Sequence, residues 1–178
     1  MRLISAIRLL AVLPFIGGCD DKSEQVPNEF SPAVPMPAAS LAPDRALTRI
    51  ALGSCYHPSL KSGIFNEITA QNPDVFVFLG DNVYAADESD DPTLMSLRES
   101  YANLSAVESF AALRESTPLL VAWDDHDYGK DDAGGDFKHR DFSESLYEYV
   151  WNIEPSDERT SRPGVYFEQT LGPTDKQV

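Results

Sequence analysis

Short apolar runs alternate with segments of helical periodicity through the middle of the chain. Residues 48–52, 75–79 and 119–122 form short apolar runs, as is typical of β-strands. The run at 75–79 has no polar alternation, which indicates a strand covered on both faces. Between these runs, apolar residues recur at helical spacing within 63–72 and again within 94–114. Strand, helix and strand in this order predict parallel pairing through right-handed crossovers, and therefore an α/β fold.

The chain continues this mixed pattern after the third apolar run. Apolar side chains spaced over 142–153 indicate one amphipathic helix. A turn-rich connection at 159–164 follows it. The pattern of 165–170 then predicts one further strand.

Residues 1–19 have the pattern of an export signal. Arg2 and Arg8 form a positive amino-terminal region, and the apolar stretch 9–16 is too short to span a bilayer as a helix. Small residues then precede Cys19, which resembles the bacterial lipoprotein signal, in which the cysteine is lipidated and becomes the mature amino terminus. An ordinary secretory signal is the alternative. Both predict export, and the first predicts lipid anchoring to a membrane of the cell envelope, on the periplasmic face.

Residues 20–46 are rich in proline and have neither helical nor strand periodicity. We therefore expect a semi-extended, disordered tether there. The globular unit is expected over 47–178.

The acidic composition limits the classes of partner. The formal net charge is −15, and it becomes about −17 without the two arginines of the export signal. Nucleic-acid backbones are bound by neutralising phosphates with Lys and Arg, so this composition argues against a nucleic-acid-binding surface. A phosphorylated substrate would need cations between it and the protein. The pattern carries no information on the oligomeric state.

Cysteine usage points to one unusual thiol. If Cys19 is lipidated, Cys55 is the one cysteine left, and no intramolecular disulfide can form. Cys55 follows a predicted strand end, which favours a metal ligand. The alternative is a buried small apolar residue, the commoner role of a free cysteine.

Potential metal ligands follow each of the first three predicted strands. In chain order they are Cys55, then Asp81 and Tyr84, then Asp124, Asp125 and His126. Ligands at the carboxyl ends of neighbouring parallel strands converge on one crevice. The sequence therefore predicts a metal-dependent active site.

The residue types suggest roles within such a site. A carboxylate that bridges two cations holds them close enough to clamp a phosphoryl group and to generate hydroxide, and Asp81 is placed for that bridge. A phenolate from Tyr84 with a thiolate from Cys55 would suit ferric iron. Asp124 and Asp125 would add hard oxygen ligands.

His126 is a candidate either for orienting a metal ligand through a hydrogen bond or for acting as general acid near the leaving oxygen, and with Asp125 it forms the predicted catalytic pair. Taken singly, each residue also has a structural interpretation. Gly-Asp after a strand is common in turns, a tyrosine there is often packed, and an Asp-Asp-His run can cap and turn the chain.

Three ordered motifs resemble those of a known enzyme family. They are GSC at 53–55, GDNVY at 80–84 and WDDHDYG at 123–129. These are similar to the first three blocks of the PhoD-like (alkaline phosphatase D) metallophosphatases of the calcineurin-like superfamily. The resemblance runs over about 50–172. It implies an α/β/β/α sandwich, present here as the amino-terminal half of the domain.

The resemblance also implies an activity and its cofactors. The family hydrolyses phosphomonoesters or phosphodiesters with iron and calcium, and other divalent cations are alternatives. Carried over residue by residue, it assigns iron to Cys55, Asp81 and Tyr84, the bridge to calcium to Asp81, the calcium side to Asp124 and Asp125, and assistance in catalysis to His126.

Two departures from the family pattern change the expectation. Asp131 and Asp132 stand where similar sequences tend to have Asn-Asp, which alters cation preference. The later Gly-Asp-x-His block is not found before Val178, so we expect this chain to be truncated and weakly active or inactive.

The alternative function is a non-enzymatic acidic envelope lipoprotein that binds calcium or a partner.

Overall fold

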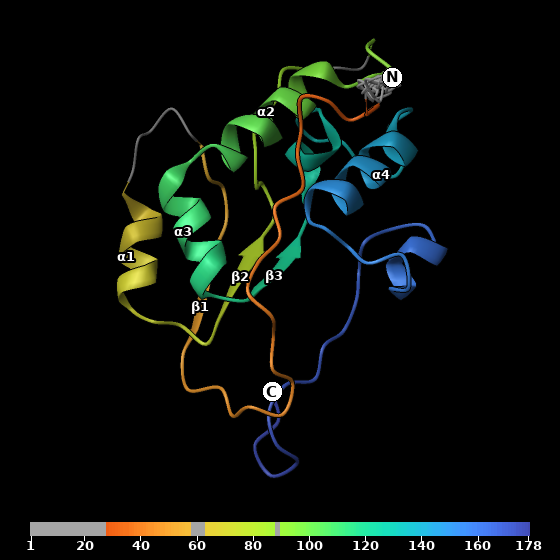
Figure 1. The fold of residues 1–178 in the computed structure, drawn as a ribbon. Helices are drawn as coiled ribbons and strands as arrows, with labels where there is room; N and C mark the ends of the chain where they lie inside the picture. Colours follow the sequence, from red (N-terminus) through yellow and green to blue (C-terminus); the bar gives the residue numbers. More distant parts are fainter. Residues whose placement is uncertain (1–27, 58–62, 88–89) are drawn as a thin grey trace, which may run out of the picture.

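Three parallel strands form the centre of the molecule, in the order β1-β2-β3 (Figure 1). The computed structural model describes residues 28–57, 63–87 and 90–178. Its helices and strands are β1 (Ile50–Gly53), α1 (Ile64–Ala70), β2 (Val75–Leu79), α2 (Met95–Ser105), α3 (Glu108–Ser116), β3 (Leu119–Ala122), the 3-10 turn η2 (Asp125–Tyr128), α4 (Arg140–Val150) and the 3-10 turn η3 (Glu158–Ser161). The α/β class, the parallel pairing and the first three strands are therefore confirmed.

One face of the sheet is buried under helices. Aromatic rings join β2 to the helical layer, since Phe78 lies 6.4 Å from Phe65 of α1, 6.2 Å from Phe110 of α3 and 6.3 Å from Trp151 at the end of α4, measured between ring centroids. Phe65, Phe78 and Phe110 are all at most 2% exposed. These contacts make the core of the domain.

The other face of the sheet is open. The register pairs Leu52 with Val77 and Leu79 with Ala122, so alternate residues of the strands share this face. Leu52 is 65% exposed and Leu79 is 50% exposed, so the expectation that the strand at 75–79 is covered on both faces is wrong for the described residues. The described residues thus contain one sheet with helices on one side, which agrees with one half of an α/β/β/α sandwich. The helices in this part of the chain are all too short or too polar to cross a bilayer.

The expectation of a free tether over 20–46 is wrong for residues 28–43. Ala33 and Met36 are 3% and 1% exposed and belong to the core. The Met36 amide donates to Val150 O at 2.7 Å, and the Ala39 amide donates to Arg114 O at 2.7 Å, so the segment runs between α3 and α4 (Figure 1). Proline sets an extended backbone, but it does not prevent apolar side chains between the prolines from packing. The preceding part of the predicted tether and the export signal lie outside the described residues.

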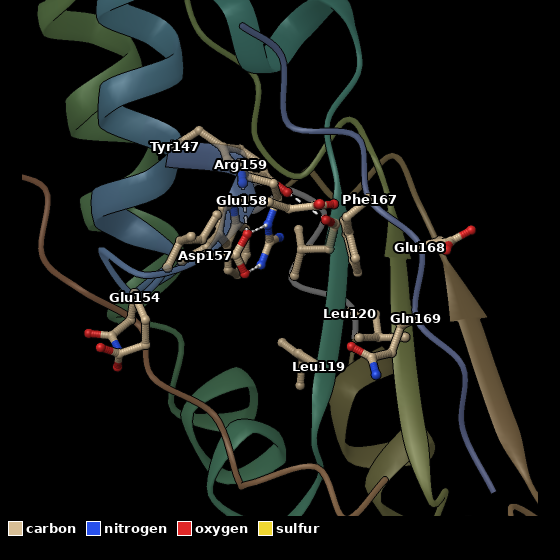
Figure 2. A pocket seen from close by; sticks show the side chains of 14 residues that line it. Leu119, Leu120, Tyr147, Glu154, Asp157, Glu158, Arg159, Phe167, Glu168 and Gln169 are labelled. Carbon is tan, nitrogen blue, oxygen red and sulfur yellow. Dashed lines mark hydrogen bonds and ion pairs between the residues drawn. The ribbon is translucent and has the colours of Figure 1, made fainter. Parts of the chain in front are cut away.

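The predicted strand at 165–170 is also wrong. The segment is extended but makes no ladder with a neighbour. A cavity of about 430 Å³ separates it from β3 and is lined from both sides, by Leu119, Leu120 and Val121 and by Phe167, Glu168 and Gln169 (Figure 2). The sequence pattern indicated an extended chain here, but a strand also needs a hydrogen-bonding partner at the right distance.

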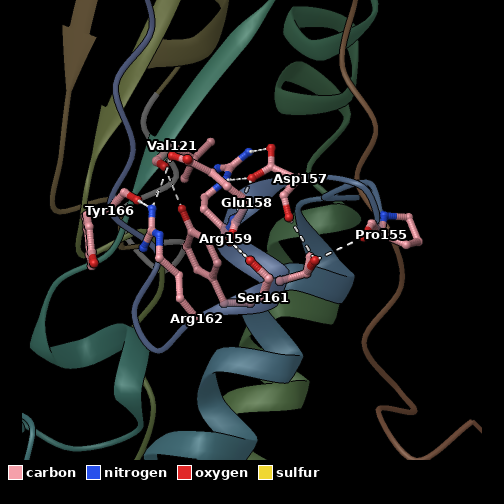
Figure 3. A network of polar contacts seen from close by, with 10 residues as sticks. Val121, Pro155, Asp157, Glu158, Arg159, Ser161, Arg162 and Tyr166 are labelled. Carbon is pink, nitrogen blue, oxygen red and sulfur yellow. Dashed lines mark hydrogen bonds and ion pairs between the residues drawn. The ribbon is translucent and has the colours of Figure 1, made fainter.

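Arginine contacts hold this segment instead (Figure 3). Arg159 donates through Nε and Nη2 to the two oxygens of Asp157, each at 2.8 Å, and its guanidinium lies 4.3 Å from the centre of the Phe167 ring. These hydrogen bonds hold the pKa of Asp157 down at about 2. Arg162 stacks on Tyr166 at 3.6 Å and also donates to Gly164 O at 2.9 Å. Arg159, which lines the cavity at the edge of β3, is therefore already paired with Asp157.

Candidate metal centre

The loops that follow β1 and β2 stay side by side beyond the strands. The Cys55 amide donates to Gly80 O at 3.3 Å, and the Tyr56 amide donates to Asp81 O at 3.1 Å. Cys55 and Asp81 both have positive φ, 57° and 48°, so the backbone turns sharply where each side chain leaves the sheet. This tight path brings the ends of the two strands to one place.

Glycine at position 80 lets the third loop approach as well. Gly80 has a φ of 100°, and a Cβ there would lie 2.8 Å from the Asp124 Cβ. A larger residue would be both strained and in collision with the backbone after β3. Glycine at position 80 is therefore required for the close approach of the second and third strand ends.

Asp81 lies at the centre of the resulting group. Its Oδ2 accepts a hydrogen bond from the Tyr84 hydroxyl at 2.9 Å, and the Cys55 Sγ lies 3.6 Å from the same oxygen. Its Oδ1 is buried and has no hydrogen-bond partner. Cys55 is exposed, so the alternative of a buried small apolar residue is wrong.

Asp125 and His126 approach Asp81 from the turn after β3. One ligand atom from each of Asp81, Asp125 and His126 lies within 4.8 Å of the other two. All three residues are half-buried. The His126 Nε2 is 3.2 Å from Asp131 Oδ1, and the His126 ring lies 4.3 Å from that of Tyr84.

The ionisation of these groups favours negative oxygen at Asp125 and a neutral phenol at Tyr84. Burial acts to raise the pKa of Asp125, but the hydrogen bond from the Asp132 amide and the neighbouring His126 outweigh it and leave that pKa below its usual value. Burial, and then the hydrogen bond to Asp81, raise the pKa of Tyr84. Without a cation, Tyr84 is therefore a hydrogen-bond donor rather than a phenolate.

Asp124 caps the turn that follows β3. Its carboxylate accepts a hydrogen bond from the Asp125 amide at 3.0 Å and forms a capping box with Asp127 at the start of η2. Aspartate is favoured at this position because it satisfies free amides of the first turn. The structure brings Cys55, Asp81, Tyr84, Asp125 and His126 together and uses Asp124 to shape the turn that carries two of them.

Sequence reasoning missed two residues beneath the group. Asn82 and Asp127 are both 0% exposed. Burial raises the pKa of Asp127 to about 7 against the opposing effect of the hydrogen bonds that it accepts. The signal that could have revealed Asp127 is the Asp-x-x-Asp spacing of a capping box that starts at Asp124.

The residues of the group fit a bound cation. A buried carboxylate oxygen without any partner, as at Asp81, is unfavourable unless a donor or a cation satisfies it. Carboxylates and an imidazole suit divalent cations, and an adjacent phenol and thiol suit ferric iron. These residues together could hold a cation. We call this group, which consists of Cys55, Asp81, Tyr84, Asp125 and His126, the strand-end centre.

Comparisons with known proteins identify the family of this chain. Residues 50–149, which carry all three strands and the strand-end centre, match the family model of the PhoD-like phosphatases. A solved structure described as "Structure of PhoD" is similar in fold, with a TM-score of 0.51 and 16% sequence identity over 77% of this chain. The match covers 30% of that chain's length. No curated protein sequence matches. By its sequence from the first strand to α4, this chain belongs to the PhoD-like phosphatase family.

Proposed function

We propose that the strand-end centre serves a metal-dependent phosphoesterase that hydrolyses phosphomonoesters or phosphodiesters. The observation that supports this most is the convergence of Asp81, Asp125 and His126 beside the unpartnered buried oxygen of Asp81. The family supplies the reaction class, a phosphatase. The proposed substrate is a phosphorylated small molecule or a phosphodiester.

Iron and calcium are the proposed cations, with other divalent cations as alternatives. Cys55, Asp81 and Tyr84 would hold iron, because a thiol and a phenol flank one carboxylate oxygen. Asp81 and Asp125 would face calcium, which prefers oxygen ligands. Bound cations would polarise the phosphoryl oxygens and lower the pKa of a bound water.

The side chains of the strand-end centre have separate proposed roles in binding the cations and in catalysis. Asp81 offers one oxygen to Tyr84 and Cys55, which leaves the other for a cation. The Asp132 amide holds the Asp125 carboxylate in place. His126, 20% exposed and oriented by Asp131, is proposed to give a proton to the leaving oxygen.

A matched pair of carboxylate variants tests the proposal. We would load the chain with Fe³⁺ and Ca²⁺, measure bound metal, and follow hydrolysis of p-nitrophenyl phosphate and bis-p-nitrophenyl phosphate. We expect slow turnover that falls about 100-fold or more in Asp81→Asn, since loss of a bridging ligand removes several kcal/mol of charge stabilisation. Asp90→Asn, a control at an exposed carboxylate paired to Lys138, should leave turnover unchanged.

Measurable turnover that is equal in Asp81→Asn and the unsubstituted chain would refute the assignment. Loose calcium binding with neither iron nor turnover would favour the alternative, a non-enzymatic acidic lipoprotein.

Export and lipid anchoring at Cys19 are a separate proposal. The support is the sequence pattern alone, because Cys19 lies outside the described residues. Incorporation of labelled palmitate that is lost in Cys19→Ser would support anchoring to the cell envelope, and equal labelling of both chains would exclude it.

A further inference from the structure

Most of the strand-end centre lies in the loops after β2 and β3, and the sheet itself does not hold these two loops together. The pairing of β2 with β3 ends at Leu79 and Ala122. Asp81 comes after the first of these residues, and Asp125 and His126 come after the second. Some other contact must therefore fix the separation between Asp81 and the pair on η2.

Asp127 makes that contact as the acceptor of four hydrogen bonds. Its Oδ2 accepts from the Asn82 amide at 3.3 Å, from Asn82 Nδ2 at 3.2 Å and from the Asp124 amide at 3.0 Å. Its Oδ1 accepts from the Tyr101 hydroxyl at 3.0 Å. The donors come from the loop after β2, the turn after β3 and helix α2, so one carboxylate joins three segments.

Asn82 completes the connection. Its Nδ2 also donates to Ala122 O at 2.8 Å, the last residue of β3. Asn82 directly follows Asp81, and Asp127 directly follows His126. Any shift of one loop against the other would break several of these hydrogen bonds and leave a fully buried carboxylate unsatisfied, which is strongly unfavourable.

Neither residue belongs to the group of potential ligands. The group found among the described residues consists of Asp81, Asp125 and His126. Asp127 and Asn82 lie beneath it, with no exposed surface through which to reach a substrate. Their effect on the centre must therefore be exerted through its neighbouring residues.

We propose that Asp127 and Asn82 are positioning residues that fix Asp81 at its distance from Asp125 and His126, so that the two carboxylates can hold one cation beside His126. The proposal rests on the proposed function, because it requires that the centre binds metal. It assigns to the buried carboxylate a role in metal affinity and coordination geometry beyond its contribution to folding.

Co²⁺ is a suitable probe, because its visible absorption reports both binding and coordination geometry. We would titrate the full chain and its Asp127→Ala variant with Co²⁺ and record their urea unfolding in parallel. Residues that orient metal ligands typically change affinity by about 10- to 100-fold, so we expect Asp127→Ala to bind Co²⁺ about 10- to 100-fold more weakly and with an altered spectrum. Asp127→Asn retains an acceptor oxygen and should recover most of the affinity.

Asp74→Ala is the matched control. Asp74 is also a buried acceptor, with bonds from Thr48 N at 2.7 Å and Arg49 N at 3.0 Å, but it lies at the amino end of β2, opposite the centre. We expect this variant to lose stability while its Co²⁺ affinity stays within about twofold of the unsubstituted chain.

The outcomes separate the two proposals. Absence of Co²⁺ binding by the unsubstituted chain would overturn the metal centre itself. Binding by the unsubstituted chain with equal affinity and spectrum in Asp127→Ala would overturn the positioning role alone. If Asp127→Ala does not fold, Tyr101→Phe decides, because it removes one hydrogen bond and keeps the ring: weaker Co²⁺ binding supports the role, and unchanged binding overturns it.

Discussion

Tyr84 is a single residue with two roles, a hydrogen-bond donor without a bound cation and a proposed ligand with one. In the structure its hydroxyl donates to Asp81 at 2.9 Å, and burial together with that hydrogen bond keeps its pKa high. A ferric ion competes with the proton for the same oxygen, because the phenolate is a preferred ligand of Fe³⁺. The residue thus acts as a hydrogen-bond donor in one state and as a proposed ligand in the other.

The first prediction concerns this change of role. The chain loaded with Fe³⁺ should show a visible charge-transfer absorption from the phenolate of Tyr84. Tyr84→Phe should abolish that band, because it removes the ligand oxygen and keeps the ring. Absorption spectroscopy checks this, with Tyr166→Phe, a substitution at a 69% exposed ring, as the control that keeps the band. Persistence of the band in Tyr84→Phe would exclude the phenolate assignment.

Gly80 carries the second prediction. Gly80→Ala should destabilise the fold by about 1–3 kcal/mol, because alanine is strained at a φ of 100° and its Cβ would lie 2.8 Å from the Asp124 Cβ. Urea unfolding measures the loss. Gly63→Ala is the matched control, since a Cβ there meets nothing within 4 Å, and its stability should change by less than about 0.5 kcal/mol. Equal effects of the two substitutions would contradict the close approach described here.

The two ends of the sheet are organised differently at the scale of elements. At the amino end, Asp74 directly precedes β2 and accepts hydrogen bonds from Thr48 and Arg49, which lead into β1. At the carboxyl end, Asp127 joins the loops after β2 and β3. A carboxylate therefore ties neighbouring elements at each end, and only the second lies beneath the strand-end centre.

The third prediction follows from the ionisation of Asp74. Hydrogen bonds from Thr48 and Arg49 lower its pKa from 3.8 to about 2 in the folded protein. Stability from the ionised form is therefore complete above about pH 5 and is lost as the pH falls from about 4 towards 2.

Asp74→Asn should accordingly cost about 2 kcal/mol at pH 7 and have a smaller effect near pH 2. Urea unfolding at several pH values measures both. A cost that does not depend on pH would contradict a charged Asp74 in the folded state.

The amino-terminal segment joins the fold at the scale of the whole molecule. Residues 28–43 lie between α3 and α4, and the Gly172 amide donates to Pro43 O at 2.7 Å, so the segment also contacts the last part of the chain. Met36 is 1% exposed within the core. The described domain therefore starts before its first strand.

The fourth prediction tests this boundary. Met36→Ala should lower the free energy of unfolding by about 2–4 kcal/mol, because it creates a cavity in the core. Val34→Ala, at a side chain that is 46% exposed, should cost less than about 1 kcal/mol. Denaturant unfolding of both variants distinguishes a packed segment from a tether, for which neither substitution would matter.

The local sequence pattern was sufficient to predict the three strands and the polar side chains that follow them. The run Val75–Leu79 is apolar and lies in the middle of the sheet, and the order of the runs along the chain implies parallel pairing. The convergence of Asp81 with Asp125 and His126 follows from that topology, since the carboxyl ends of parallel strands lie at one edge.

The features that the sequence did not predict depend on contacts between residues far apart in the chain. The hydrogen bonds from Asn82 to Asp127 join positions 45 residues apart, and no local pattern reports them. The packing of residues 28–43 in the core and the absence of a ladder at 165–170 were not predicted for the same reason. The sequence by itself determined which side chains are available at the strand ends, because that depends on neighbours along the chain. Only the tertiary structure decided which of them meet and what holds them there, because that depends on how distant segments pack.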